Sequence, residues 1–164
     1  MKRKIKFRGK TPKGEWLYGD LQQWNDGTVY IAVNSEWWTD DGIQSSDYLT
    51  ILEVNPDTVG QFTGLCDKNG KEIYEGDILK DCWADGSVGI ELVGFENGSF
   101  GSMDNYTYQS LQKGYKYPRF NHKFLYSMFD GTAKNFISVD VIGNIYDTPE
   151  LLKPNKSSTH IKTL

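Results

Sequence analysis

The 164-residue chain lacks the features that mark several classes of protein. Its two cysteines, Cys66 and Cys82, form no C-x-x-C pair and are too few for a disulfide framework. No apolar run approaches the roughly 20 residues of a membrane-spanning helix. The basic start, residues 1–4, is not followed by the apolar stretch of a signal peptide. We therefore expect a soluble protein with reduced thiols in the cytoplasm, without contact to a membrane.

The residues that are plentiful favour β structure. Hydrophobic residues make up 38% and aromatic residues 14%, which is enough for a core and excludes a fibrous or disordered chain. Seventeen Gly and ten Tyr favour strands and turns over helices. Six Asp-Gly or Asn-Gly pairs, each typical of a hairpin turn, separate short alternating segments. The pattern predicts a mainly β fold, a meander of antiparallel strands in small barrels or sandwiches.

The net charge of −4 is unevenly distributed. Residues 1–13 carry seven Lys or Arg and no acid, which leaves 11 positive against 22 negative charges for the rest of the chain. A basic arm of this kind is able to bind nucleic acid or an anionic partner. Residues 4–8, however, alternate basic and apolar residues as a strand with one wet face does. We favour the strand interpretation.

An internal repeat is the most informative pattern. The segment Gly14–Leu21 is similar to Gly70–Ile78, which has one extra residue. Each is followed by Trp-x-Asp-Gly-[Thr/Ser]-Val-x-Ile, at Trp24–Ile31 and at Trp83–Ile90, an offset of 59 residues. Matching tryptophans in the same order indicate a tandem duplication of a unit of about 50 residues, the size of a small β-barrel.

A third block sets the length of an insertion. Val59–Phe62 matches Ile142–Ile145 at an offset of 83 residues, so the second copy holds about 24 extra residues, which we place within 99–125. We expect a first β-barrel-like unit over 1–66, a second over 67–153 with this insertion, and a flexible tail over 154–164. The two small units should pack together, because each alone has little core. Thr148, Pro149 and Glu150 predict a short C-terminal helical turn.

Six residues recur in both copies, and we assign them structural roles. The Gly-Asp pairs precede apolar segments, where Gly permits a sharp turn or bulge and Asp bonds nearby backbone N–H groups. The tryptophans precede the Asp-Gly turns and can pack across a hairpin. These residues are Gly19, Asp20, Trp24, Gly76, Asp77 and Trp83.

Four segments together resemble a known family. Val59–Leu65 and Asp67–Ile78 resemble the signature of the YopX family of phage and prophage proteins, Val141–Leu152 is similar to its closing motif, and Ile5–Arg8 fits its start. The resemblance implies a mainly β architecture with SH3-type barrel units. It implies no activity, and no catalytic residue can be carried over.

Catalytic and metal-binding patterns are scarce. Gly9–Thr11 imitates the end of a phosphate loop, but Lys4 stands where the leading glycine is required. His122 and His160 lie far in sequence from both cysteines, so we predict no metal site and no cofactor. No Gly-x-Ser-x-Gly elbow occurs. The acids of one series are read as solvated groups beside turns, and none is assigned to catalysis: Glu72, Glu75, Asp77, Asp81 and Asp85.

One segment is a candidate binding surface. Lys113–Phe124 interleaves cations with aromatic residues and contains no acid. Its aromatic residues either cover the second barrel, form a protein interface, or stack on unpaired bases while the cations pair with phosphates. The candidate binding residues are Lys113, Tyr115, Lys116, Tyr117, Arg119, Phe120 and Lys123.

The sequence thus favours an accessory protein of a phage or prophage, not an enzyme, that binds another protein or a second copy of itself. The alternative is a single-stranded nucleic-acid-binding module that uses residues 113–124. The net charge and a pI near 5.2 disfavour duplex DNA as the main ligand, because backbone binding requires clustered positive charge.

Overall fold

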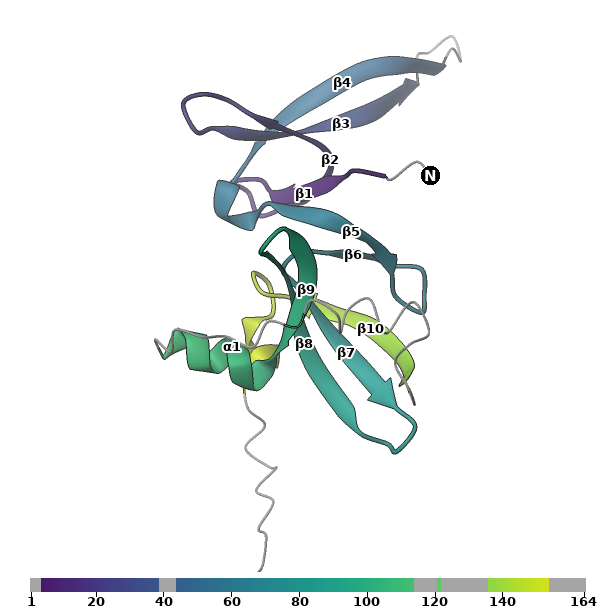
Figure 1. The fold of residues 1–164 in the computed structure, drawn as a ribbon. Coiled ribbons are helices and arrows are strands. Elements are labelled where there is room, and N and C mark those ends of the chain that lie inside the picture. Colours follow the sequence, from purple (N-terminus) through teal and green to yellow (C-terminus); the bar gives the residue numbers. More distant parts are fainter. Residues whose placement is uncertain (1–3, 39–43, 114–120, 122–135, 154–164) are drawn as a thin grey trace, which may run out of the picture. The chain divides into compact units, whose positions relative to one another are not determined.

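A computed structural model describes residues 4–38, 44–113, 121 and 136–153. The chain divides into two compact units. Unit 1 holds residues 1–66 and 72–75, and unit 2 holds residues 67–71 and 76–164. Each unit is built on an antiparallel sheet (Figure 1).

Unit 1 contains a six-stranded sheet in the order β4-β3-β2-β1-β5-β6. Its small core consists of Val29, Ile31 and Val54, against which partly buried apolar side chains from β1, β2 and β3 pack. A short 3-10 helix, η1, leads into β5. The elements are β1 (Phe7–Lys10), β2 (Trp16–Gln23), β3 (Val29–Trp38), β4 (Gln44–Val54), η1 (Pro56–Thr58), β5 (Gly60–Cys66) and β6 (Glu72–Tyr74).

Unit 2 contains a four-stranded sheet in the order β10-β7-β8-β9. Its core consists of Ile78, Leu92 and Leu152, with partly buried apolar side chains around them. The elements are β7 (Asp77–Trp83), β8 (Val88–Glu96), β9 (Ser99–Asp104), α1 (Asn105–Gln112), β10 (Phe136–Asn144) and the 3-10 helix η2 (Pro149–Leu152).

The mainly β prediction is confirmed, but the prediction of closed barrels is wrong. In the part of the chain that the structure describes, the edge strands β4 and β6 do not pair with each other, and neither do β10 and β9. Turn signals and alternating patterns specify hairpins, which are the same in an open meander and in a barrel. Closure depends on pairing between strands far apart in sequence, and no local pattern encodes that pairing.

The two Trp-x-Asp-Gly turns have the same backbone hydrogen bonds. In the first, Trp24 N–H donates to Thr28 O at 2.9 Å and Gly27 N–H donates to Trp24 O at 3.0 Å. The turn at Trp83 and Gly86 repeats both bonds, at 3.0 and 2.9 Å. The strand register is also the same, because β2 pairs with β3 as β7 pairs with β8, 59 positions later.

The preceding hairpin turns share a second pattern. Thr11 N–H donates to Glu15 O, and Asp67 N–H donates to Lys71 O, both at 2.8 Å. In each turn the fourth residue is a glycine with positive φ, +87° and +81°. The third matching block behaves differently, because 59–62 belongs to a segment that pairs with β1, whereas 142–145 belongs to one that pairs with β7.

The expected insertion contains secondary structure that the sequence pattern did not reveal. Strand β9 and helix α1 both lie within 99–125. Asp104 begins the helix, since its Oδ1 accepts a hydrogen bond from Thr107 N–H at 2.6 Å. The expected C-terminal turn is η2, although Thr148 makes no capping bond with its side chain. The tail over 154–164 lies outside the described residues.

No helix in the described ranges is long and apolar enough to cross a lipid bilayer. Both cysteines are free thiols: Cys66 is exposed and Cys82 is half-buried.

Candidate functional site

Most of the predicted binding segment lies outside the described residues. This applies to Tyr115, Lys116, Tyr117, Arg119, Phe120 and Lys123. Lys113 is described: it is exposed at the C-terminal end of α1, where its N–H donates to Gln109 O at 3.2 Å. Asn121 forms an antiparallel bridge with Ser102 of β9.

The two matched glycines meet different requirements. A Cβ on Gly19 would lie 1.9 Å from the backbone oxygen of Ala32, so only glycine allows β2 and β3 to approach there. Gly76 has a φ of +83°, a conformation that L side chains rarely adopt. Its N–H donates to Val93 O and its carbonyl accepts from Ile145 N–H, both at 2.9 Å.

The matched aspartates and tryptophans also differ in burial. Asp20 is exposed, whereas Asp77 is 1% exposed. Trp24 is exposed and contacts the Tyr30 ring at 5.0 Å between centroids. Trp83 is half-buried, lies 5.7 Å from the Phe136 ring, and donates its Nε1–H to an Asp81 oxygen.

In unit 1, basic residues of the N-terminal segment are held by an acid of β6. Lys6 Nζ and Lys4 Nζ lie 2.7 and 2.9 Å from Glu72, and Tyr74 donates its hydroxyl to Glu72 at 2.6 Å. Burial opposes ionisation, yet hydrogen bonds from Lys6, Tyr74 and Lys4 lower the pKa of Glu72 to about 2. These contacts favour the strand interpretation over a free basic arm.

Arg8 is a buried cation of unit 1. It is 5% exposed, and its guanidinium lies 4.7 Å from the Trp16 ring centroid and 5.1 Å from that of Tyr74. Its Nη2 donates to Glu75 O at 3.0 Å. Burial, followed by the neighbouring Glu72, raises the pKa of Tyr74 well above its usual range. These contacts favour a structural role for the cluster of Arg8, Trp16 and Tyr74.

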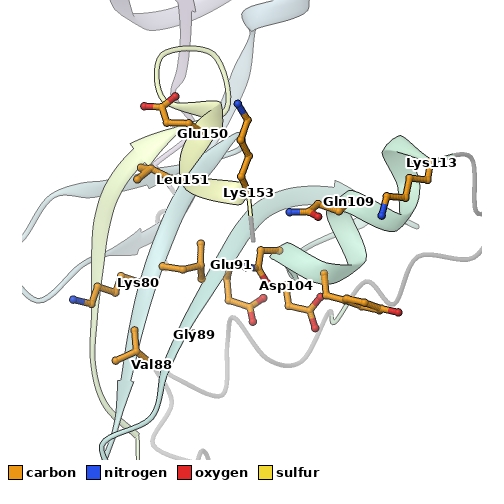
Figure 2. Close-up of a pocket in the computed structure, with 13 residues that line it drawn as sticks. Lys80, Val88, Gly89, Glu91, Asp104, Gln109, Lys113, Glu150, Leu151 and Lys153 are labelled. Carbon is orange, nitrogen blue, oxygen red and sulfur yellow. The ribbon is translucent and has the colours of Figure 1, made fainter. Parts of the chain in front are cut away.

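Unit 2 contains an open pocket of about 960 Å³ (Figure 2). Side chains from β7, β8, α1, η2 and the end of β9 line it. Gln109 of α1 donates its Nε2–H to Leu152 O at 2.6 Å, which ties the helix to η2. On its rim Tyr106 is 78% exposed and Val88 is 55% exposed.

Two carboxylates lie at one end of the pocket. Glu91 and Asp104 are directly opposite each other in the β8–β9 ladder, and Figure 2 shows their side chains next to each other. Burial raises the pKa of Glu91 to about 7, and the nearby charges of Asp81 and Asp104 act in the same direction, against the Ser102 hydroxyl. Like charges placed opposite each other in a sheet are destabilising.

Two buried polar groups lie beside this pair. Asp81 is 2% exposed, and one of its oxygens, Oδ1, has no hydrogen-bond partner among the described residues. Asp81 lies opposite Gly89, which lines the pocket. A Cβ on Gly89 would lie 2.1 Å from that Oδ1. Ser102 is fully buried, and its hydroxyl is the group that lowers the pKa of Glu91.

Sequence reasoning missed this site. Asp77 and Asp81 were expected to be solvated, and that expectation is wrong, since both are buried. One signal of this burial was available in the sequence. Side chains alternate along β7, so Asp81 lies on the same face as Leu79. Among the described residues, no group of three or more His, Cys, Asp or Glu side chains is placed to hold a metal ion.

A comparison with family models matches residues 6–153 to the family described as YopX protein. No curated protein matches the chain. Among solved structures, the chain is similar to the crystal structure of protein EF1440 from Enterococcus faecalis, with 23% identity and a TM-score of 0.45. The similarity covers 93% of this chain and 100% of that chain.

Proposed function

The chain belongs to the YopX family, and we propose that it is a non-catalytic accessory protein that holds a segment of a partner protein in the pocket of unit 2. The phage or prophage setting implied by the family resemblance makes the cytoplasm of a bacterial cell the place where it meets this partner. A second copy of the chain is one candidate for the partner.

The observation that carries the proposal is an open strand edge next to the pocket. Strand β9 ends at Asp104, opposite Glu91. Residues 88–90 of β8 therefore pair with β7 on one side, and within the described ranges no strand pairs with them on the other side. An extended protein segment can add to such an edge through backbone hydrogen bonds. All three residues of this edge line the pocket, so an added segment would place its side chains there.

The side chains around this edge suit a protein segment. Tyr106 and Val88 present exposed aromatic and apolar surface, and Glu91 and Asp104 line the same pocket with their carboxylates. Tyrosine is enriched where proteins bind each other, because it joins a large apolar ring to a polar tip. At about 960 Å³, the pocket is at the upper end of the range for small-molecule sites.

Site-specific crosslinking tests the proposal. A photoreactive phenylalanine analogue at position 106 should crosslink one defined protein, or a second copy of the chain, in cells that express the protein. The matched control is the same analogue at Tyr146, which is exposed in unit 2 but does not line the pocket. Equal crosslinking from both positions, or none from position 106, would contradict the proposal.

The two units also support a proposal about origin. We propose that they descend from one duplicated unit, as the repeat suggests, of the SH3-like kind that the family resemblance implies. The shared turn bonds and the shared register of the β2–β3 and β7–β8 hairpins favour it. The different pairing of the third matching block means that the copies have diverged after β8.

The second candidate function is binding of single-stranded nucleic acid by residues 113–124. One observation favours it: Lys113, the first residue of that segment, lines the same pocket. In the sequence, aromatic and basic residues follow Lys113 and offer rings for stacking and cations for phosphates.

A further inference from the structure

We propose that Glu91 and Asp104 bind a guanidinium or ammonium group, with Asp81 and Ser102 as the buried polar support of the site. This inference rests on the proposed function, because it names the chemistry of the group that enters the pocket. The starting observation is the unfavourable placement of two carboxylates opposite each other in one ladder.

Neither carboxylate is neutralised by a side chain of the described residues. The ion pairs found there join other groups, Lys4 and Lys6 to Glu72 and Lys68 to Asp140. Figure 2 shows the amines of the three pocket lysines spread around the periphery, with the Lys80 amine pointing away from the carboxylates. A cation that lies between Glu91 and Asp104 would relieve their mutual repulsion.

A buried group is a second and independent indication of a ligand. The Asp81 carboxylate occupies the space that a side chain on Gly89, a residue of the pocket wall, would fill, since a Cβ there would lie 2.1 Å from Oδ1. This oxygen lacks a hydrogen-bond partner in the described ranges, and an unsatisfied buried polar group is unfavourable. Asp81 and Ser102 both lie on the Glu91 side of the sheet, because paired residues of a ladder share a face: Asp81 pairs with Gly89, and Ser102 with Val93.

An extended organic cation fits this arrangement better than a metal ion. A metal requires several ligands that converge on one point at about 2.0–2.6 Å, and the described acids do not converge in that way. A guanidinium has five N–H donors in a planar fork and reaches acceptors on different sides. An arginine side chain carried by a segment on the β8 edge would supply such a fork.

Binding should depend on pH, because the cation selects the ionised form of Glu91. The charged groups around Glu91 are Asp81 of β7 and Asp104 of β9, with Lys80, Lys113, Glu150 and Lys153 on the pocket lining. At pH 5.5 Glu91 is mostly protonated, and at pH 8 it is mostly ionised. Affinity for the cation should therefore rise about fivefold or more between these values.

Titration of the purified full chain with short peptides tests the site. The probe is acetyl-Ala-Arg-Ala-amide, and its control is the same peptide with citrulline, which has the same shape without the charge. In a ¹⁵N-labelled protein, the arginine peptide should shift the amide signals of Gly89 and Glu91 saturably at pH 8. Equal shifts with the citrulline peptide would overturn the proposal.

Variants of the two acids complete the test. Glu91→Gln and Asp104→Asn should each weaken arginine-peptide binding about tenfold, as expected for loss of one charge-assisted pair. Asparagine at 104 keeps a side chain able to begin α1. The matched control is Glu96→Gln, the same change on an exposed residue of β8 outside the pocket, which should leave the affinity unchanged. Affinities of Glu91→Gln and wild type that agree would contradict the assignment.

Two further comparisons identify the source of the cation. Spermidine that binds at least as tightly as the peptide, with the same dependence on Glu91, assigns the site to a free polyamine. Tighter binding of arginine peptides that have strand-forming flanks assigns it to a protein. Crosslinking from position 106 that persists in Glu91→Gln would remove the cation site but keep the proposed function. Arginine-peptide binding without a crosslinked protein would keep the cation site but remove the proposed function.

Discussion

Asp81 and Gly89 face each other across β7 and β8, and the Asp81 carboxylate occupies the space that a side chain at position 89 would fill. The other carboxylate oxygen accepts the Trp83 indole N–H, which fixes the direction of the group. The absence of a side chain on one strand thus allows a charged group of the next strand to be buried beside the pocket.

Gly89→Ala should therefore destabilise unit 2 by about 1–3 kcal/mol, as overpacking in a core does. The new Cβ would lie 2.1 Å from Asp81 Oδ1, so the carboxylate must move. Urea unfolding followed by tryptophan fluorescence measures the change. A double-mutant cycle with Asp81→Ser should recover part of the loss, because the smaller side chain leaves room for the methyl group. Additive effects in the cycle would contradict this explanation.

Gly19→Ala and Gly76→Ala should both lower stability, but asparagine in place of alanine should restore part of it only at position 76. At Gly19 the methyl group meets the backbone oxygen of Ala32, so every larger residue should destabilise unit 1 by a similar amount. At Gly76 the cost arises from the positive φ and is about 1–2 kcal/mol. Asparagine tolerates that conformation and should restore part of the stability at 76 but none at 19. Thermal unfolding of the four variants checks the contrast.

Acid should destabilise unit 1 through Glu72. Its pKa in the folded chain is about 2, below the ordinary 4.5, because hydrogen bonds from Lys6, Tyr74 and Lys4 outweigh the opposing effect of burial. The stabilisation is present above pH 4.5 and is lost as the pH falls from 4.5 through 2. Glu72→Gln should lose up to about 2 kcal/mol at pH 7 and almost none at pH 2, after allowance for its partial exposure. Glu53→Gln, on an exposed residue of β4, is the control in urea unfolding at each pH.

Glu91 should show the opposite dependence. Burial first, then the charges of Asp81 and Asp104, raise its pKa from 4.5 to about 7. A raised pKa favours folding below pH 4.5, and that contribution is lost as the pH rises through 7. Glu91→Gln should equal the wild type below pH 4.5 and exceed its stability above pH 7 by about 1–3 kcal/mol. Equal stability of the two proteins at pH 8 would show that the carboxylate is not under this strain.

Local patterns in the sequence predicted the hairpins well and the sheet order poorly. The Trp24 and Trp83 turns follow from Asp-Gly chemistry, which requires only neighbouring residues. The pairing of β10 with β7, by contrast, joins strands separated by more than 50 residues, and nothing local encodes it. Helix α1 was missed because Asn105–Gln112 is mostly polar, with only Thr107 buried.

The pocket was missed for a related reason. Glu91, Asp104 and Asp81 stand far apart in the sequence and come together through strand register. Each one, taken alone, has the pattern of a solvated acid near a turn. Burial of Asp81 depends on a glycine eight residues later, a relationship that only the β7–β8 pairing establishes.

The last prediction tests the candidate segment 113–124 directly. If it binds nucleic acid, fluorescence anisotropy with a labelled single-stranded oligonucleotide at low salt should report binding, and the logarithm of the affinity should fall linearly with the logarithm of salt concentration. The double variant Lys116→Ala with Arg119→Ala should reduce the slope, since each phosphate contact contributes about 0.7 to it for single strands.

The control for this test removes the same charge elsewhere. Lys13→Ala with Lys71→Ala changes two exposed lysines outside the segment and should leave the slope as it is in the wild type. Tyr117→Ala separates stacking from charge, because loss of a stacked base costs about 1–3 kcal/mol of binding without changing the salt dependence. An equal effect of both double variants would mean that only net charge matters. No binding of single or double strands would eliminate nucleic acid as a ligand and leave protein binding, with the cation site of unit 2 at its centre, as the function to pursue.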